Sequence, residues 1–268
     1  MLSISIVTYK SDIDLLQRLL CSLDKTINNL SGRFIIDQIS IIDNSNLDLR
    51  SSIDIDKYEN IISQLQFYRN PKNVGYGAAH NIAIRKSNSK YHLILNPDLL
   101  LAEDNLDKAL HFMEENPKVV AISPNGIDKA GNKLSLTKNY PTILNFFLRI
   151  LPAWLKDKIF IKERMAEYEN KAVVENNKIQ DVLIISGCYM LCRREILDNV
   201  GLFNEKYFLY FEDFALSLEL IKFGRLVYNP YVKINHFGGN TSRKGLRHII
   251  YFIRSAIRFF NDYGWKII

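Results

Sequence analysis

Cysteine is scarce in this chain of 268 residues, which contains only Cys21, Cys188 and Cys192. Three scattered cysteines cannot form the disulfide framework that small secreted domains need. Cys188 and Cys192 also lack a second Cys or His pair at the spacing of a zinc site. The scarcity therefore excludes both a disulfide scaffold and a zinc-finger protein, and we interpret the three residues as buried thiols in a reducing compartment.

Long apolar runs are also missing. The first residues, Leu2 to Val7, form a strand-like pattern with no basic segment or cleavage site of a signal peptide. The most apolar later stretch, 143–155, is interrupted by Asn145, Arg149 and Pro152 and is shorter than the roughly 20 residues that span a bilayer. We therefore expect a cytoplasmic protein that touches the inner face of the cell membrane at most peripherally.

The charge balance is basic, with a formal net charge of +6 and a pI of about 9.0. A hydrophobic fraction of 47% and a charged fraction of 24% are typical of a folded globular protein. The excess of positive charge favours an anionic partner, such as a nucleotide sugar, an anionic lipid surface or a nucleic acid. Because no helix-turn-helix, RRM or zinc-finger pattern is present, we expect no nucleic-acid partner.

Strand and helix patterns alternate along the first half of the chain, which predicts an α/β fold with a mainly parallel central sheet flanked by helices. A helical, aromatic and basic segment from 141 to about 170 is interpreted as an insertion. Single strands are expected at 225–227 and 232–235, and an amphipathic helix from about 246 to 263. No linker separates independent parts, so we expect a single domain over 1–268.

Polar side chains follow three of the strand-like runs. Thr8 and Tyr9 end the first, Asp43 ends the run 38–42, and Asn96 and Asp98 follow the run 91–95. Carboxyl ends of parallel strands share one edge of a sheet, where open α/β sheets bind nucleotides. Asp98 suits Mg²⁺ or Mn²⁺, which prefer oxygen ligands. The alternative for Asp98 and Asp43 is an ordinary turn.

Small residues lead into a helix between Asn73 and Asn81, around Gly75. A backbone without bulky side chains can approach a diphosphate closely at a helix start. The segment does not match a dinucleotide fingerprint, because His80 stands at the third glycine position. A helix start packed tightly on the sheet is the alternative interpretation.

Glu212 and Asp213 are adjacent acids within the aromatic stretch 207–214. Apolar surroundings raise the pKa of a carboxyl group and suit it to accept a proton from an attacking hydroxyl. A helix cap is the alternative, because acids are favoured at helix N-termini. His236 closes a strand and is a candidate metal or phosphate ligand, although a lone histidine is more often structural.

The basic and aromatic C-terminal helix allows two interpretations. Arginines interleaved with apolar residues suit an anionic membrane surface. The other interpretation is a helix packed on the core with a solvated basic face.

Together these motifs resemble family 2 of the inverting glycosyltransferases with the GT-A fold, and within it the rhamnosyltransferase-like members. The resemblance covers most of the chain and rests on the order and spacing of the following segments: 5–9, 42–45, 73–77 with Asn81, 95–98, 186–188, 201–205, 208–213 and His236. It implies a nucleotide-sugar-binding half over 1–125 and an acceptor-binding, catalytic half over 126–268.

The resemblance also implies roles for individual residues. Thr8, Tyr9 and Asp43 would bind the nucleoside, and Asp98 with His236 would hold Mn²⁺ or Mg²⁺. Asn73, Gly75, Asn81 and Asn96 belong to the donor-binding segments. Asp213 would be the base, with Glu212 as the other candidate.

The implied activity is transfer of rhamnose or another hexose from a dTDP- or UDP-sugar to a glycan or lipid-linked saccharide, in the assembly of a cell-surface polysaccharide. Asn96 stands where many relatives have an acid, and so does Ala215. These departures leave open a catalytically inactive, nucleotide-sugar-binding partner subunit. A nucleotidyltransferase lacks support, because its glycine- and arginine-rich loop is missing after Val7.

Overall fold

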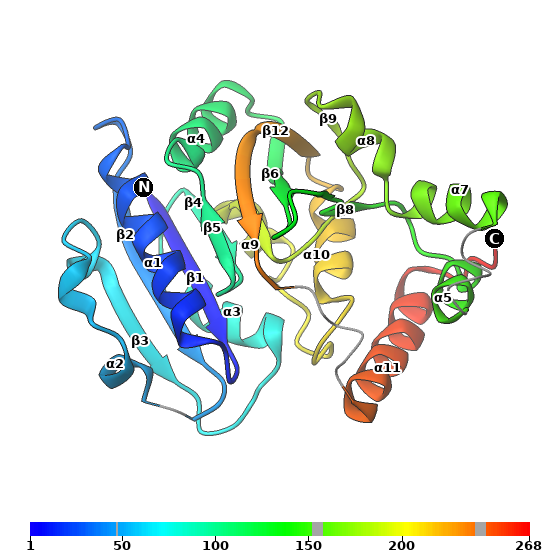
Figure 1. Ribbon diagram of the computed structural model, residues 1–268, viewed down its shortest axis with the longest axis horizontal. Coiled ribbons are helices and arrows are strands. Elements are labelled where there is room, and N and C mark those ends of the chain that lie inside the picture. The colour runs from blue at the N-terminus through cyan, green and yellow to red at the C-terminus, as the bar shows by residue number, and fades with distance from the viewer. Residues whose placement is uncertain (47, 152–157, 239–244) are drawn as a thin grey trace.

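The computed structural model describes residues 1–46, 48–151, 158–238 and 245–268 (Figure 1). The strands are β1 (Leu2–Thr8), β2 (Ile36–Asp43), β3 (Leu65–Arg69), β4 (Tyr91–Leu95), β5 (Leu99–Leu101), β6 (Val119–Ile127), β7 (Lys133–Leu134), β8 (Thr137–Lys138), β9 (Gln180–Asp181), β10 (Ile184–Ile185), β11 (Tyr189–Arg193) and β12 (Arg225–His236). The helices are α1 (Ile13–Asn28), α2 (Leu49–Ser52), α3 (Tyr76–Arg85), α4 (Asn105–Glu115), α5 (Ile143–Ile150), α7 (Ile159–Tyr168), α8 (Lys171–Asn176), α9 (Arg194–Asn199), α10 (Glu212–Leu220) and α11 (Leu246–Tyr263).

One sheet runs through the molecule in the order β3-β2-β1-β4-β11-β6-β12-β5. Strands β1, β2, β3 and β4 pair in parallel, and β6 pairs in parallel with β12. Strand β11 is antiparallel to both β4 and β6, so these two blocks of strands point in the same direction. The predicted α/β class with a mainly parallel sheet is confirmed. The sheet is mixed, because β11 and the short strands β5, β7 and β9 pair antiparallel with their neighbours.

Successive side chains of the central strands point to opposite faces of the sheet, and both faces are buried. Leu93 and Leu95 of β4 belong to the apolar cluster that contains the buried leucines of α1 and α4. Ile94 belongs to a second cluster, formed with α9 and α10. This alternation is the period of two expected of strands buried on both faces.

A buried chain of serines and histidines joins β1, β4 and α3. Ser5 Oγ lies 2.6 Å from Nδ1 of His80 and 2.8 Å from Nε2 of His92, and Ser3 Oγ lies 2.7 Å from Nδ1 of His92. Burial lowers the pKa of His80 well below its ordinary value and that of His92 to about 3, so both rings are neutral. These contacts fix α3, whose first residues border the candidate site.

Several predicted elements are confirmed, whereas the two separate strands predicted near the C-terminus are wrong. The burial predicted for the three cysteines holds for Cys188 and Cys192 but not for Cys21, which is exposed. The insertion contains α5 and α7, while 152–157 lie outside the described residues, and the C-terminal helix is α11. The strands predicted at 225–227 and 232–235 form one irregular strand, β12, whose register with β6 shifts between Asn229 and Lys233. Pro230 lies in this interval and lacks the N–H that a regular ladder requires. Within the described residues, no helix is both long and apolar enough to cross a bilayer.

Candidate active site

The carboxyl ends of β1 and β2 bring Thr8 and Asp43 together. Oγ1 of Thr8 donates to Oδ1 of Asp43 at 3.1 Å, and the same oxygen accepts from the backbone N and the Oγ of Ser45, at 3.1 and 2.6 Å. Both Thr8 and Asp43 are buried, whereas Tyr9, the next residue of the chain, is exposed. The hydrogen bonds hold the Asp43 carboxylate in one orientation, and the accessible Tyr9 follows Thr8 directly in the chain.

The loop before α3 is fastened to the same edge. Nδ2 of Asn44 donates to the carbonyl of Gly75 at 3.0 Å, and the Gly75 N–H donates to Oδ1 of Asn73 at 2.9 Å. The N–H of Tyr76 donates to the carbonyl of Phe208 at 3.0 Å. Segments 73–76 and 208 therefore meet here, although they lie far apart in the sequence.

Asn96 and Asp98 follow β4 and lie beside the end of β12. Oδ1 of Asp98 is 3.3 Å from Nε2 of His236, and the Phe237 N–H donates to the Asp98 carbonyl at 2.8 Å. Oδ1 of Asp98 is buried without a hydrogen-bond partner among the described residues. Gly238 packs directly against the Asp98 carboxylate. A buried carboxylate oxygen facing an imidazole nitrogen is a suitable pair of ligands for a divalent cation.

Few side chains at this point could coordinate a metal ion. No group of three His, Cys, Asp or Glu side chains suited to a metal occurs in the part of the chain that the structure describes. Mg²⁺ and Mn²⁺ sites in enzymes commonly use one or two carboxylates, with substrate phosphates and water completing the shell, and an imidazole nitrogen suits Mn²⁺ better than Mg²⁺. Asp98 and His236 fit this mode of binding, which needs a bound diphosphate to be complete.

Tyr76 connects this edge to the paired acids. Its hydroxyl lies 3.0 Å from Oδ1 of Asn96 and 2.7 Å from the carbonyl oxygen of Gly187. The Gly187 N–H in turn donates to Oδ2 of Asp213 at 2.9 Å. Burial, together with the acids Glu212, Asp213 and Asp98 nearby, raises the pKa of Tyr76 well above its ordinary value. The hydroxyl therefore stays protonated between the end of β4 and Asp213.

The two acids differ in their surroundings. Glu212 is buried, and its Oε2 has no hydrogen-bond partner among the described residues. Asp213 is partly accessible and accepts hydrogen bonds from the N–H groups of Gly187 and Phe214. Burial raises the pKa of both carboxyls, that of Glu212 well above its ordinary value. At Asp213 the hydrogen bonds from the Gly187 and Phe214 N–H groups, and to a smaller extent Lys138, partly offset this effect. The negative charge of the pair therefore belongs on Asp213.

The backbone that carries these acids is strained. Tyr210 and Phe211 both have positive φ angles, of 70° and 65°, which bulky residues rarely adopt. Phe211 is the residue before α10, and its ring packs in a cluster with Phe146 of α5 and with Phe252 and Phe259 of α11. This packing holds the turn that directs Glu212 and Asp213 toward the end of the sheet.

Asn81 lies apart from the predicted donor-binding residues. Its amide nitrogen donates to the carbonyl of Phe203 and to Oε1 of Glu205, and its oxygen accepts from the Phe203 N–H. Both N–H donors of this buried side chain are thus used by the loop 203–205. We therefore interpret Asn81 as an anchor of that loop, in place of the ligand contact predicted for it.

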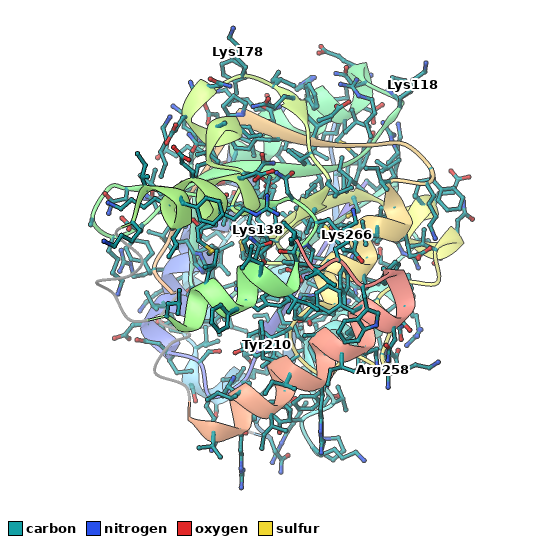
Figure 2. All side chains as sticks on the ribbon, turned by 90° about the vertical axis from the view of Figure 1, so that its right-hand side faces the viewer. Lys118, Lys138, Lys178, Tyr210, Arg258 and Lys266 are labelled. Atoms are coloured by element: carbon teal, nitrogen blue, oxygen red, sulfur yellow. The ribbon has the colours of Figure 1, made fainter. Side chains whose placement is uncertain are left out.

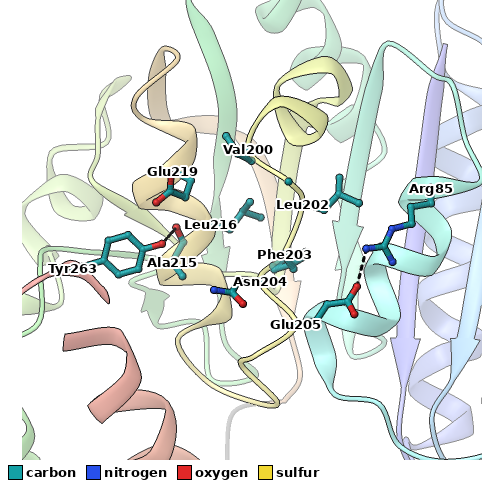
Figure 3. Close-up of a pocket in the computed structure, with 11 residues that line it drawn as sticks. Arg85, Val200, Leu202, Phe203, Asn204, Glu205, Ala215, Leu216, Glu219 and Tyr263 are labelled. Carbon is teal, nitrogen blue, oxygen red and sulfur yellow. Dashed lines mark hydrogen bonds and ion pairs between the residues drawn. The ribbon is translucent and has the colours of Figure 1, made fainter. Parts of the chain in front are cut away.

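A separate cavity of about 410 Å³ opens beside the same loop (Figure 3). It lies between α10 and α3, and the ion pair of Arg85 with Glu205 closes one side at 2.8 Å. None of the predicted site residues lines it. Asn81 thus faces the loop 203–205. The predicted residues that the structure brings to one edge of the sheet are Thr8, Asp43, Asn73, Gly75, Asn96, Asp98, Asp213 and His236.

Tyr76 and Gly187 contribute to the site although sequence analysis assigned no role to either. The available signal for Tyr76 was a tyrosine between two glycines at a helix start, a position where aromatic bulk is unexpected if the segment serves only close packing. The contacts of its hydroxyl with Asn96 and Gly187 explain why a tyrosine stands there.

Comparisons with known proteins agree with this geometry. The chain is 24% identical over 244 residues to an N-acetylglucosaminyl-diphospho-decaprenol L-rhamnosyltransferase of Mycobacterium tuberculosis, covering 85% of this chain and 76% of the relative. It is 25% identical over 178 residues to the rhamnosyltransferase WbbL of Escherichia coli K12, covering 63% of each.

Solved structures share the GT-A fold of the chain at low sequence identity. GalNAc-T7 with UDP, GalNAc and Mn²⁺ matches with a TM-score of 0.66 and 14% identity, over 97% of this chain and 47% of that one. The mannosyltransferase PcManGT of Pyrobaculum calidifontis, in complex with GDP-Man and Mn²⁺, matches with a TM-score of 0.61 and 16% identity, over 96% and 64%. The chain thus spans about half the length of the GalNAc-T7 chain.

The model of the family described as "Glycosyl transferase family 2" matches residues 3–201, from β1 to the second residue after α9. This range contains the ends of β1, β2 and β4, the start of α3 and Gly187. The chain therefore belongs to glycosyl transferase family 2.

Proposed function

We propose that this glycosyltransferase moves a sugar from a nucleoside diphosphate to a hydroxyl group of a glycan or lipid-linked saccharide, with inversion at the anomeric carbon. A dTDP- or UDP-sugar is the proposed donor, and dTDP-rhamnose is the first to test, because relatives of the chain are rhamnosyltransferases. The observation that carries the proposal is the path from Asn96 through Tyr76 and Gly187 to Asp213.

The donor would lie along the edge formed by β1, β2 and β4. The exposed Tyr9 ring can stack on a base, and the paired Thr8 and Asp43, at the ends of β1 and β2, would make polar contacts with the nucleoside. Asn73, Gly75 and Asn96 would border the diphosphate and the sugar. A divalent cation held by Asp98 and His236 would supply positive charge opposite the diphosphate.

Asp213 is the proposed base. A base must reach the acceptor hydroxyl, and Asp213 is more accessible than the buried Glu212. The backbone N–H of Gly187 orients its carboxylate, and burial raises its pKa toward the range in which it can take a proton. The acceptor oxygen would then form a bond to the anomeric carbon as the bond to the diphosphate breaks, in a single displacement that inverts the configuration.

The test compares Asp213→Asn with the wild type in transfer from a panel of nucleotide sugars, with Mn²⁺ and with EDTA. We expect turnover to fall about 10²- to 10⁴-fold while donor affinity, measured by calorimetry, stays within a factor of about two. Asp56→Asn, which changes an exposed aspartate at the 3-10 turn Ile55–Lys57, is the matched control. The wild type should lose activity on acidification at a pH above the ordinary aspartate pKa of 3.8.

Near-normal turnover of Asp213→Asn would remove this residue from the mechanism. A wild type that binds a nucleotide sugar but neither transfers nor hydrolyses it would identify the inactive partner subunit instead.

A further inference from the structure

The inner face of α11 fastens the segment that leads to the paired acids. Ser255 Oγ donates to the carbonyl of Leu209 at 2.8 Å, and the Tyr210 hydroxyl lies 3.0 Å from Nδ1 of His248. Phe259 is fully buried against the rings of Phe211 and other members of the aromatic cluster. Helix α11 is therefore an integral part of the enzyme, and its inner face already has its partner.

The outer face of the same helix is apolar. Its exposed aliphatic residues are Leu246, Ile249, Ile250, Ile253 and Ile257, with exposed fractions between 42% and 78%. Their spacing of three and four residues aligns them in one stripe along the helix. A helix at the surface of a globular protein normally turns a polar face to water, and a continuous apolar stripe indicates an interaction surface.

A row of arginines runs along one side of the stripe. Arg247, Arg254 and Arg258 are exposed, at intervals of seven and four residues. Figure 2 shows Arg258 projecting from α11 near the C-terminal end of the helix. The acid of this helix, Asp262, accepts a hydrogen bond from the Tyr207 hydroxyl at 2.8 Å. Aliphatic residues beside a row of cations form the pattern of a helix that lies in a membrane interface.

Helix α5 and the C-terminal residues extend this surface. Phe146 packs against Phe252 and Phe260 of α11, and its neighbour Phe147 is exposed. Trp265 stacks on Phe260 and is about half exposed. Figure 1 places α5, α11 and the C-terminus at the same end of the molecule, opposite β3.

We propose that the outer face of α11 docks on a membrane that contains anionic lipids. The aliphatic stripe would enter the boundary between headgroups and acyl chains, and the arginine row would lie at the phosphates. The inference extends the proposed function, because a lipid-linked acceptor in that membrane would lie next to the segment 207–213 that α11 holds. A second copy of this chain would fit the outer face of α11 less well. In an antiparallel pair of α11 helices the two rows of arginines would lie side by side and repel each other.

The test measures co-sedimentation of the full chain with phosphatidylcholine vesicles, with and without phosphatidylglycerol. We expect binding only when phosphatidylglycerol is present. Changing Ile253→Asn together with Ile257→Asn should lower the partition coefficient more than about tenfold. Ile35→Asn is the matched control, since Ile35 is a 62% exposed isoleucine before β2 and should bind like the wild type.

The arginine row has its own test. Each of Arg254→Gln and Arg258→Gln should weaken binding to the anionic vesicles about fivefold, and added salt should weaken wild-type binding in the same direction. Absence of wild-type binding to anionic vesicles would overturn the proposal, as would Ile253→Asn/Ile257→Asn binding as the wild type does. A concentration-dependent dimer in sedimentation velocity that this double variant abolishes would overturn it in favour of a second copy.

Donor hydrolysis separates this proposal from the proposed function. The double variant at Ile253 and Ile257 should hydrolyse a nucleotide sugar at the wild-type rate, because neither residue borders the site. Vesicle binding without any transfer or hydrolysis of the donor would overturn the proposed function alone. Hydrolysis without vesicle binding would overturn membrane docking alone.

Discussion

Replacing Gly75 by alanine would test how closely the loop before α3 packs against the segment that leads to the paired acids. The φ of 97° and ψ of 170° of Gly75 fall in a region that essentially only glycine occupies. A Cβ placed there would lie 2.6 Å from the carbonyl oxygen of Phe208, in the segment that leads to Glu212 and Asp213. Both backbone strain and a clash with backbone atoms therefore oppose Gly75→Ala.

The size of the effect follows from these two contributions. Placing alanine in this conformation costs about 1 to 3 kcal/mol. Overpacking against a backbone that cannot rotate away adds about 1 to 3 kcal/mol. We expect Gly75→Ala to lower the free energy of unfolding by about 2 to 6 kcal/mol, a large part of the 5 to 15 kcal/mol typical of a domain.

Gly264 provides a matched control, because its φ of 107° and ψ of 142° are similar but a Cβ there would meet open space. Urea denaturation followed by circular dichroism gives the two free energies of unfolding, and calorimetry gives the affinity for a nucleoside diphosphate. Gly75→Ala should also weaken that affinity, because displacement of Phe208 breaks its hydrogen bond with the Tyr76 N–H. Equal destabilisation by Gly75→Ala and Gly264→Ala would refute close packing of segment 208 on α3.

Two further predictions concern Glu212 and Tyr76. Burial raises the pKa of Glu212 well above its ordinary value, so the wild-type protein loses stability as the pH rises past the ordinary glutamate pKa. Glu212→Gln removes this carboxyl and should raise the melting temperature at about pH 8. The gain should shrink toward about pH 5, where the carboxyl is increasingly protonated in the unfolded chain as well. A gain that is equal at both pH values, measured by differential scanning fluorimetry, would contradict this. Tyr76→Phe removes the hydroxyl that touches Asn96 and Gly187, so kcat/KM should fall about two- to tenfold. The exposed Tyr231→Phe is the control, and an unchanged kcat/KM for Tyr76→Phe would assign the hydroxyl no part in the site.

Local patterns were sufficient for most individual elements. Alternating and apolar runs predicted β1, β2 and β4. The start of α1 is equally local, because Oδ1 of Asp12 accepts from the N–H groups of Asp14 and Leu15. These features depend on neighbours within a few residues, which a sequence displays directly. The region around Pro230 was the exception: two separate strands were predicted there, whereas β12 continues past the proline with a shifted register.

Such local patterns do not predict which strands lie side by side in the sheet. The contact of Asp98 with His236 exists because β12 pairs with β5, at His236 and Leu99. The contact of Tyr76 with Gly187 exists because β11 inserts antiparallel beside β4. Both pairings join segments about a hundred residues or more apart, and register between such strands is set by packing of the whole sheet. The resemblance to a known family supplied this information for the predicted residues but not for Tyr76.

The left-handed turn at Tyr210 and Phe211 shows why the position of the proposed base depends on distant parts of the chain. Neither residue is a glycine or an asparagine, so nothing in the local sequence indicates positive φ angles. Each such residue costs about 1 to 3 kcal/mol and persists only where its surroundings hold it. Here the surroundings are aromatic side chains from α5 and α11, which pack around Phe211. Loosening α11 would let this turn relax, so the helix proposed to meet the membrane is also the one that keeps Asp213 at the end of the sheet.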